Sequence, residues 1–327
     1  MPRVLVVPPI IRDQPNRNRE IFEAGGFEVV YPTVHETYLD RPMLLANLRG
    51  IDAVVAGAER YDEEVFSQSR LRVVARFGVG YDAVDVESAS RRKIAVTITA
   101  GANEDSVAEQ ALALIFGVFR QVPRRDRDVR HGEFRRSVGA RIRGKTLGLV
   151  GLGRIGRALA WRAAGLGMNV IACDPCADAA YCDGQRIQLC QLEMLLGTAD
   201  IVSLHLPGGP ETKHLINAET LRLMKPSAVL INTARGTLVD EVALIEALQQ
   251  GTIHAAGLDV FAREPLPADN PLVQLDNVVV SPHVAGWDYE SIAAMAEISA
   301  RCVVDLYQGR WPEGCVVNDQ LRPGWKW

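Results

Sequence analysis

The sequence lacks several features that would each mark a specialised class of protein. No apolar run approaches the ~20 residues that a membrane-spanning helix needs, and there are no internal repeats or low-complexity tracts. The formal net charge of −4 gives no overall attraction for nucleic acid or anionic membranes. The N-terminus, MPRVLVVPPIIRD, lacks the apolar core and cleavage site of a signal peptide. These absences predict a cytoplasmic protein with neither nucleic-acid nor membrane partners.

A second zinc-type cysteine pair is also missing. Four of the six cysteines lie between 173 and 190, and Cys173 and Cys176 have the Cys-x-x-Cys spacing of zinc or redox sites. Asp174 and Pro175 separate that pair, and no further Cys-x-x-Cys supplies the remaining ligands. Reduced, structural thiols and no metal site are therefore the favoured interpretation.

The length and composition indicate a globular protein with more than one domain. A chain of 327 residues is too long for one ordinary core, so two domains are expected. Hydrophobic residues make up 48% and charged residues 23%, as is typical of soluble globular domains.

A glycine-rich turn begins the most informative part of the chain. The run 147–156, LGLVGLGRIG, combines a short buried strand with a Gly-x-Gly-x-x-Gly turn that opens a helix. Gly151 permits the tight turn, Gly153 allows the backbone to approach a diphosphate, and Gly156 allows close packing of helix and strand. Amide groups at the helix start then face an anion.

An acidic residue at the expected distance strengthens this interpretation. A helix over 158–166 and a strand over 169–173 lead to Asp174, which follows Gly156 by 18 residues. In a Rossmann unit, an acid at about this place binds the adenosine ribose hydroxyls. Its charge repels a 2′-phosphate, so NAD is preferred over NADP as cofactor. The alternative is a glycine turn with an unrelated surface aspartate.

The rest of the chain alternates strand and helix, which predicts parallel sheets covered on both faces. The fold class is α/β, with two Rossmann-like, doubly wound domains and a cleft between them. We expect residues 1–100 to begin a flavodoxin-like substrate domain, 101–287 to form a central NAD-binding Rossmann domain, and 288–327 to return to the first domain through the helix 289–308.

Residues 120–145 form a basic stretch with ten Lys or Arg residues and three acidic ones. Nucleic-acid binding is one interpretation of such a run. However, Asp126, Asp128 and Glu133 are interleaved, and Phe134 is the only aromatic residue. A solvated connector or a subunit-contact arm is favoured.

Three residues that could carry chemistry follow successive predicted strands. Arg235, Glu264 and His283 come after the strands 228–232, 255–260 and 277–281. Ligands of such sheets bind at the carboxyl ends of the strands. The guanidinium can grip a carboxylate, and the imidazole can exchange a proton with a carbonyl or alcohol oxygen while the carboxylate orients it. We treat the other histidines as structural: His35, His131, His205, His214 and His254.

These motifs resemble the D-isomer-specific 2-hydroxyacid dehydrogenase family, most closely its phosphoglycerate dehydrogenase and hydroxypyruvate/glyoxylate reductase branches. The resemblance is carried by GLGRIG with Asp174, INTARGTLVDEVAL (231–244), GLDVFAREP (257–265) and SPHVAG (281–286). It implies an NAD(H)-dependent oxidoreductase that interconverts a small 2-oxo acid and its D-2-hydroxy acid. Hydride would come from the nicotinamide, with His283 as acid/base and Arg235 and Glu264 completing the catalytic set.

The resemblance also assigns binding residues and a partner. Val79 and Gly80 would offer backbone amides to the substrate, with Arg76 nearby and Arg235 holding the substrate carboxylate. Relatives of this kind usually form homodimers through their NAD domains, which would give the basic stretch a role. The cofactor would be lined by Gly151, Gly153, Arg154, Ile155, Gly156, Asp174, Thr233, Asp259 and Gly286.

Departures from the family pattern bear on the substrate. Phosphoglycerate-specific members usually carry an additional arginine where this chain has Ala56-Gly57-Ala58-Glu59-Arg60, and the chain ends without a regulatory domain; both features disfavour 3-phosphoglycerate. Formate dehydrogenases have glutamine in place of Glu264, which disfavours that activity. The alternative function is a dinucleotide-sensing interaction protein similar to the transcriptional corepressors that resemble this family.

Overall fold

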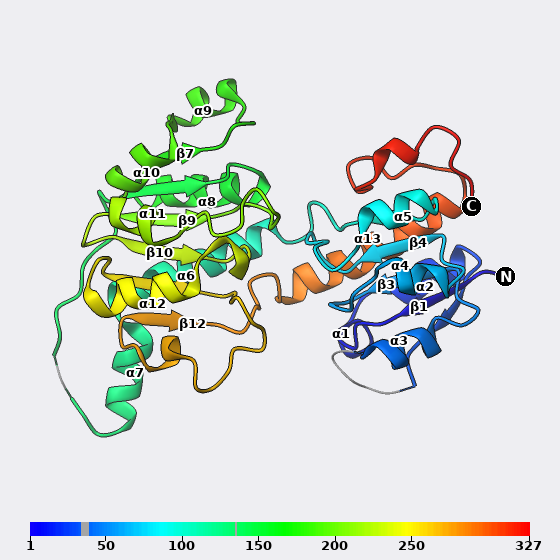
Figure 1. Cartoon of the computed structure of the whole chain (residues 1–327), viewed down its shortest axis with the longest axis horizontal. Helices are drawn as coiled ribbons and strands as arrows, with labels where there is room; N and C mark the ends of the chain where they lie inside the picture. Colours follow the sequence, from blue (N-terminus) through cyan, green and yellow to red (C-terminus); the bar gives the residue numbers. More distant parts are fainter. Residues whose placement is uncertain (34–38, 135) are drawn as a thin grey trace. The chain divides into compact units, whose positions relative to one another are not determined.

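The computed structural model describes residues 1–33, 39–134 and 136–327, so His35 lies outside the described residues. The chain forms two compact units (Figure 1). The first unit contains residues 1–103 and 286–327, and the second contains residues 104–285. In the described parts, no helix is both long and apolar enough to cross a membrane.

The first unit is built on a five-stranded parallel sheet with the order β2-β1-β3-β4-β5. This 2-1-3-4-5 order is that of flavodoxin-like folds, as predicted. The strands are β1 (Arg3–Val6), β2 (Glu28–Val30), β3 (Ala53–Ala56), β4 (Val73–Arg76) and β5 (Ala95–Thr97). The helices are α1 (Ile10–Asp13), α2 (Asn18–Ala24), α3 (Arg41–Asn47), α4 (Glu63–Ser67), α5 (Val86–Arg91) and α13 (Tyr289–Tyr307), with a 3₁₀ turn η3 (Asp319–Leu321).

Both faces of this sheet are buried, which explains its runs of valine and alanine. The long helix α13 packs against α2, β3 and β4, so the end of the chain completes the first unit. The terminal segment adds an aromatic cluster, in which the Trp327 ring lies edge-on to Phe27 and Tyr307 with centroids 5.6 and 5.1 Å away.

The second unit is built on a seven-stranded parallel sheet with the order β12-β11-β10-β9-β6-β7-β8. The order reverses between β6 and β9, which is the switch point where Rossmann folds bind ligands. The strands are β6 (Thr146–Val150), β7 (Asn169–Cys173), β8 (Gln188–Leu189), β9 (Ile201–Leu204), β10 (Val229–Asn232), β11 (Ala255–Leu258) and β12 (Val278–Val280).

Helices cover both faces of the second sheet and create two apolar cores. The longest of them, α6, packs against α8, β10, β11 and β12. The helices are α6 (Glu104–Arg120), α7 (Val122–Arg130), α8 (Arg154–Gly165), α9 (Ala179–Gln185), α10 (Leu192–Thr198), α11 (Ala218–Leu223) and α12 (Glu241–Gln250), with 3₁₀ turns η1 (Gly236–Leu238) and η2 (Pro271–Gln274).

The predicted fold class is confirmed, with differences in detail. The short edge strand β8 was not predicted, because two residues carry no periodicity and both are exposed. As a result β9, taken as the third strand of its unit, is the fourth. Helix α8 begins at Arg154 instead of residue 158, because the glycine turn itself forms its first turn. Part of the basic stretch forms α7, which has no buried residue.

Candidate active site

The glycine turn after β6 has the geometry that its sequence predicted. Gly151 has φ +99°, and a Cβ there would lie 2.5 Å from the carbonyl oxygen of His205. A Cβ on Gly156 would lie 2.4 Å from the Gly151 carbonyl oxygen, so a side chain at either position would collide with backbone. At Gly153, by contrast, a Cβ would meet no atom of the described residues within 4 Å. The first and third glycines serve the fold, and the second leaves room for a ligand.

The start of α8 is available to an anion. Gly153 is the N-cap residue, and no side chain of the described part of the chain caps this helix end. Arg154 and Ile155 form the first turn, with Arg154 exposed. Unsatisfied amide groups and the helix dipole favour a phosphate at such a position.

Asp174, the acid that is expected to bind the ribose, is held beside this turn. One carboxylate oxygen of Asp174 accepts a hydrogen bond from the Leu152 amide at 2.7 Å, and the other accepts from the Cys176 amide at 2.7 Å. The glycine turn and the end of β7 are therefore connected through the acid that resemblance assigns to the cofactor.

Thr233, just after β10, supplies an independent test of whether a ligand fits this edge. Its side chain is 7% exposed, and its hydroxyl has no hydrogen-bond partner among the described residues. Buried hydroxyls are rarely left without a partner. The open Gly153, the uncapped α8 and this hydroxyl together fit the dinucleotide that the sequence predicts.

Arg235 is presented by a turn that the buried side chain of Asn232 holds. The Asn232 amide group donates to the Arg235 carbonyl at 2.9 Å, and its oxygen accepts from the Ala234 amide at 3.0 Å. The guanidinium donates to the Ala234 carbonyl at 2.6 Å and is partly buried. Asn232 was not predicted as a supporting residue, although an asparagine at the end of a buried strand is a recognisable turn former.

Close backbone contact joins the Arg235 turn to the loop that carries Glu264. A Cβ on Gly236 would lie only 1.9 Å from the Phe261 carbonyl oxygen and 2.6 Å from the Ala262 nitrogen. Glycine is thus required by space at this position. The two loops approach because residue 236 has no side chain.

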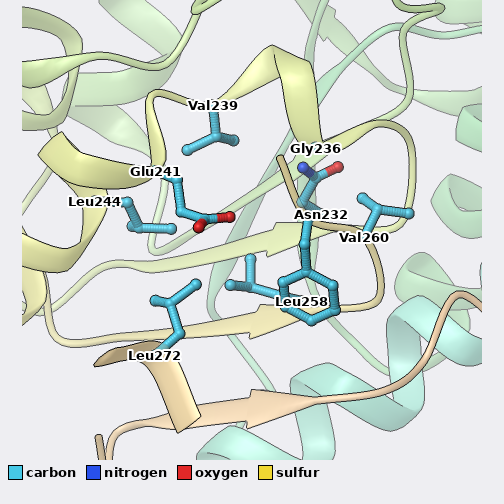
Figure 2. Close-up of a pocket in the computed structure, with 9 residues that line it drawn as sticks. Asn232, Gly236, Val239, Glu241, Leu244, Leu258, Val260 and Leu272 are labelled. Atoms are coloured by element: carbon cyan, nitrogen blue, oxygen red, sulfur yellow. The ribbon is translucent and has the colours of Figure 1, made fainter. Parts of the chain in front are cut away.

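A second support for the Glu264 loop comes from α12. The Glu241 carboxylate accepts hydrogen bonds from the Ala262 amide at 3.1 Å and from the Asn270 side chain at 2.8 Å. Figure 2 shows this carboxylate in a small, mostly apolar pocket behind the strand ends. The pocket is lined by Asn232, Gly236, Val239, Glu241, Leu244, Leu258, Val260, Phe261 and Leu272.

The structure brings Glu264 and His283 into direct contact. His283 Nδ1 lies 2.7 Å from a Glu264 carboxylate oxygen, and the other oxygen accepts from the Phe261 amide at 3.0 Å. A carboxylate only accepts, so Nδ1 carries the proton and Nε2 is left to exchange a proton with a substrate. The side chains are 50% exposed for His283 and 36% for Glu264, so both can be reached.

The charge of Glu264 is favoured by its neighbours. Burial by itself raises the pKa of this carboxyl group, but hydrogen bonds from His283 and the Phe261 amide, with the charges of His283 and Arg235, hold the pKa below its ordinary value. Glu264 is therefore an anion at neutral pH, which suits it to stabilise an imidazolium. The positive charge of Arg235 also favours the ionised form of this carboxyl group.

Asp259 lies beneath His283 rather than at the surface. Its side chain is fully buried and accepts from the Ser281 hydroxyl at 2.5 Å, the Val284 amide at 3.0 Å and the Ala285 amide at 2.9 Å. The His283 amide donates to the Asp259 carbonyl at 2.8 Å. The cofactor contact expected of Asp259 stays a prediction, while its carboxylate clearly holds the histidine turn.

That turn carries backbone strain. His283 has φ +55°, in the left-handed region that costs a non-glycine residue about 1–3 kcal/mol. Such a conformation persists only where surrounding contacts determine it, and strain of this kind gathers at functional sites.

Of the four expected substrate-binding residues, Arg76, Val79 and Gly80 belong to the first unit and Arg235 to the second. Arg76, at the end of β4, donates from Nε to the Gly80 carbonyl at 3.0 Å and from Nη1 to the Ala56 carbonyl at 3.1 Å. It therefore braces the partly buried loop with Val79 and Gly80. Gly286, which is expected to line the cofactor, packs against Asn103, since a Cβ on this glycine would lie 2.8 Å from the side-chain amide nitrogen of Asn103.

The six cysteines are free, and the described residues contain no cluster of three or more possible metal ligands. Burial raises the pKa of the thiols of Cys173, Cys182 and Cys190. Raised pKa values favour the unreactive thiol form at neutral pH.

His205, next to the glycine turn, predicts acid sensitivity. Burial lowers the pKa of its imidazole to about 4 from 6.5. Between these values the unfolded chain binds a proton that the folded chain does not, so the free energy of unfolding falls as pH falls, by at most about 3 kcal/mol. We expect His205→Gln to reduce this loss of unfolding free energy, measured by urea titration near pH 7 and near pH 5. The exposed control His254→Gln should lose as much as wild type between the two pH values. An equal loss of unfolding free energy in the two variants would contradict the prediction.

Comparison with known sequences places this geometry in a family. The model described as D-isomer specific 2-hydroxyacid dehydrogenase, NAD binding domain, matches residues 112–285. A glyoxylate reductase of Korarchaeum cryptofilum is 38% identical over 98% of this chain and 97% of its own length. A D-3-phosphoglycerate dehydrogenase of Mycobacterium tuberculosis is 44% identical over 87% of this chain, but only 56% of the relative is covered.

Solved structures agree over nearly the whole chain. The TT0316 protein from Thermus thermophilus has a TM-score of 0.87 and 37% identity, covering 96% of this chain and 100% of that one. An NADPH-dependent glyoxylate/hydroxypyruvate reductase from Sinorhizobium meliloti, in complex with NADP and malonate, has a TM-score of 0.83 and 30% identity, covering 98% of each chain. The chain belongs to the D-isomer specific 2-hydroxyacid dehydrogenase family and is an oxidoreductase that uses a nicotinamide dinucleotide to reduce 2-oxo acids to D-2-hydroxy acids.

Proposed function

We propose that this enzyme reduces a small, unphosphorylated 2-oxo acid of the glyoxylate or hydroxypyruvate type, with NADH as the reductant. The observation that carries the chemistry is the 2.7 Å contact between Glu264 and His283, with Arg235 beside them at the same sheet edge. In this proposal Arg235 binds the substrate carboxylate through two parallel hydrogen bonds. His283 donates the proton to the carbonyl oxygen that becomes the hydroxyl group.

In this proposal, each residue of the site acts on a particular atom of the substrate or group of the cofactor. A bound nicotinamide dinucleotide supplies the hydride for the carbonyl carbon. His283 delivers its proton from Nε2, and Glu264, bonded to Nδ1, fixes the ring orientation and stabilises the protonated ring. In the reverse direction the same nitrogen takes the hydroxyl proton. The start of α8 would hold the diphosphate, Asp174 the ribose hydroxyls, and Thr233 a polar group of the cofactor.

Several contacts support a small substrate without a phosphate. Two guanidinium nitrogens of Arg76 are bound to backbone carbonyls, so this cation is already engaged in bracing its own loop. Glu59, in the segment where phosphoglycerate-specific relatives carry an arginine, is a buried acid near Arg76. Burial raises the pKa of this carboxyl group, and in either protonation state the side chain offers a phosphate no positive charge.

The cofactor choice depends on Asp174. Its carboxylate would accept hydrogen bonds from the two hydroxyls of the adenosine ribose of NADH and repel the 2′-phosphate of NADPH. Solved relatives include an enzyme bound to NADP, so the family by itself does not decide between the cofactors.

A substrate panel tests the proposed function. Purified enzyme should oxidise NADH, followed by its near-ultraviolet absorbance, with glyoxylate or hydroxypyruvate faster than with pyruvate, bulkier 2-oxo acids or 3-phosphohydroxypyruvate. NADPH in parallel should give a kcat/KM at least about tenfold lower, equivalent to 1.4 kcal/mol. Faster turnover of the phosphorylated substrate, or of NADPH, would refute the corresponding half of the proposal. No turnover at all would favour the dinucleotide-sensing interaction protein.

We also propose that the chain forms a homodimer through the second unit. The segment that begins with α7 exposes four large apolar side chains. They are Val122, Val129, Phe134 and Val138, which are 56, 57, 83 and 96% exposed. Such a concentration of exposed apolar surface is typical of an interface. Light scattering that gives the mass of one chain would contradict this assignment.

A further inference from the structure

A hydrogen-bond chain from α6 reaches the turn that carries His283. The side-chain amide of Gln110 donates to the Ser281 hydroxyl at 2.9 Å, and that hydroxyl lies 2.5 Å from a carboxylate oxygen of Asp259. All these residues belong to the second unit. We infer that Gln110 and Ser281 are positioning residues, which hold His283 in the orientation that the reduction of 2-oxo acids requires.

The direction of the hydrogen bonds explains how Gln110 orients the Ser281 hydroxyl. A carboxylate only accepts, so Ser281 must donate its hydroxyl hydrogen to Asp259. The Gln110 amide donates to the same hydroxyl oxygen and therefore favours the rotamer that points the hydrogen toward the acid. Without Gln110, the Ser281 hydroxyl is free to rotate toward other acceptors.

Asp259 connects the Ser281 hydroxyl to the backbone around His283. Its carboxylate holds the amides of Val284 and Ala285, and its carbonyl holds the amide of His283. These three successive amides fix a turn that includes a residue, His283, with a left-handed φ of +55°. A strained residue stays in place only while its neighbours determine it. The loss of one donor to the buried acid should let the turn relax and move the imidazole relative to Glu264.

Such a movement should affect catalysis more than binding. General acid catalysis depends on hydrogen-bond geometry within a few tenths of an ångström, and a displacement of 1 Å can reduce the rate about 10²-fold. Ser281 and Gln110 touch neither Glu264 nor Arg235 in the contacts above. Their variants should therefore lower kcat, leave the NADH dissociation constant nearly unchanged, and disturb the pair that keeps the pKa of Glu264 low.

The inference rests on the proposed role of His283, and the experiment separates the two. We would measure kcat, KM, NADH affinity, thermal stability and the pH profile of kcat/KM for Ser281→Ala, Gln110→Ala and the double variant. Ser281→Thr keeps the hydroxyl group that Ser281→Ala removes. Glu109→Ala is the control, because this adjacent residue of α6 is exposed and its contact is with Arg162. His283→Ala serves as the reference for lost acid/base chemistry.

We expect Ser281→Ala to lower kcat about tenfold and Gln110→Ala about threefold, with NADH affinity within about twofold of wild type. The double variant should be no worse than Ser281→Ala, because Gln110 acts through the hydroxyl. Ser281→Thr should recover most of the activity. The acidic limb of the pH profile should move to higher pH in Ser281→Ala, since a looser pair raises the pKa of Glu264 toward its ordinary value.

Any of three results would overturn the inference. They are wild-type kcat in Ser281→Ala, multiplicative effects of the two substitutions on kcat in the double variant, and an equal loss of kcat in Glu109→Ala. A fall in thermal stability with an unchanged pH profile and kcat would assign the chain of bonds to folding alone and would also overturn it. If His283→Ala retained turnover, the role proposed for that histidine would fail first.

Discussion

His283→Ala is expected to lower kcat about 10²–10⁴-fold, which is the usual contribution of a general acid or base. The variant removes both the Nε2 proton donor and the Nδ1 contact to Glu264. NADH should bind with nearly wild-type affinity, because the proposed diphosphate and ribose sites lie at the glycine turn and Asp174. Stopped-flow measurement of hydride transfer, with NADH binding by fluorescence, separates the two effects.

The matched control is His254→Gln, an exposed histidine of the same unit that precedes β11 instead of following a strand. It should turn over as wild type does. If His283→Ala lost NADH affinity to the same degree as turnover, the residue would belong to the cofactor site. Retained turnover would remove His283 from the reaction altogether.

Gly236→Ala should disturb both stability and catalysis. The added Cβ would lie 1.9 Å from a backbone oxygen of Phe261, and backbone cannot rotate away as a flexible side chain can. We expect a loss of at least about 3 kcal/mol in the free energy of unfolding, at the upper end of overpacking effects. The surviving folded enzyme should also have lower kcat, because separating these loops moves Arg235 away from Glu264.

Gly209→Ala is the control for this substitution, since its Cβ would meet no atom within 4 Å in the described part of the chain and its φ is not left-handed. Its stability should stay within about 0.5 kcal/mol of wild type. Urea unfolding and steady-state kinetics on both variants decide the matter. A Gly236→Ala enzyme with unchanged stability and kcat would show that the two loops can separate without harm.

Local pattern was enough to predict several parts of the site. The glycine turn has three residues at fixed spacing, and each has its own steric reason, so Gly151 and Gly156 could be assigned before the structure. Arg235, Glu264 and His283 could be grouped because the carboxyl ends of parallel strands share one edge. The direct Glu264–His283 contact follows from that grouping, and the structure adds its length.

What supports these residues could not be predicted, since the partners are distant in the chain. Gln110 and Ser281 are 171 residues apart, and nothing near either residue indicates the other. Glu241 looks like an ordinary acid in the first turn of a helix, where the dipole favours it. Its bond to the Ala262 amide depends on how closely α12 approaches the loop, which is a property of packing. The left-handed conformation of His283 likewise has no local signal.

The location of the strand-end residues within one unit has a consequence for how such enzymes can diversify. Arg235, Glu264 and His283, with their supports Asn232, Glu241 and Asp259, all lie in residues 104–285. Loops of the other unit can therefore exchange side chains without altering the bonds that prepare the proton donor. If the 56–60 and 76–80 loops contact the substrate as proposed, grafting those loops from a relative onto this chain should change the substrate preference and leave the bonds around His283 intact.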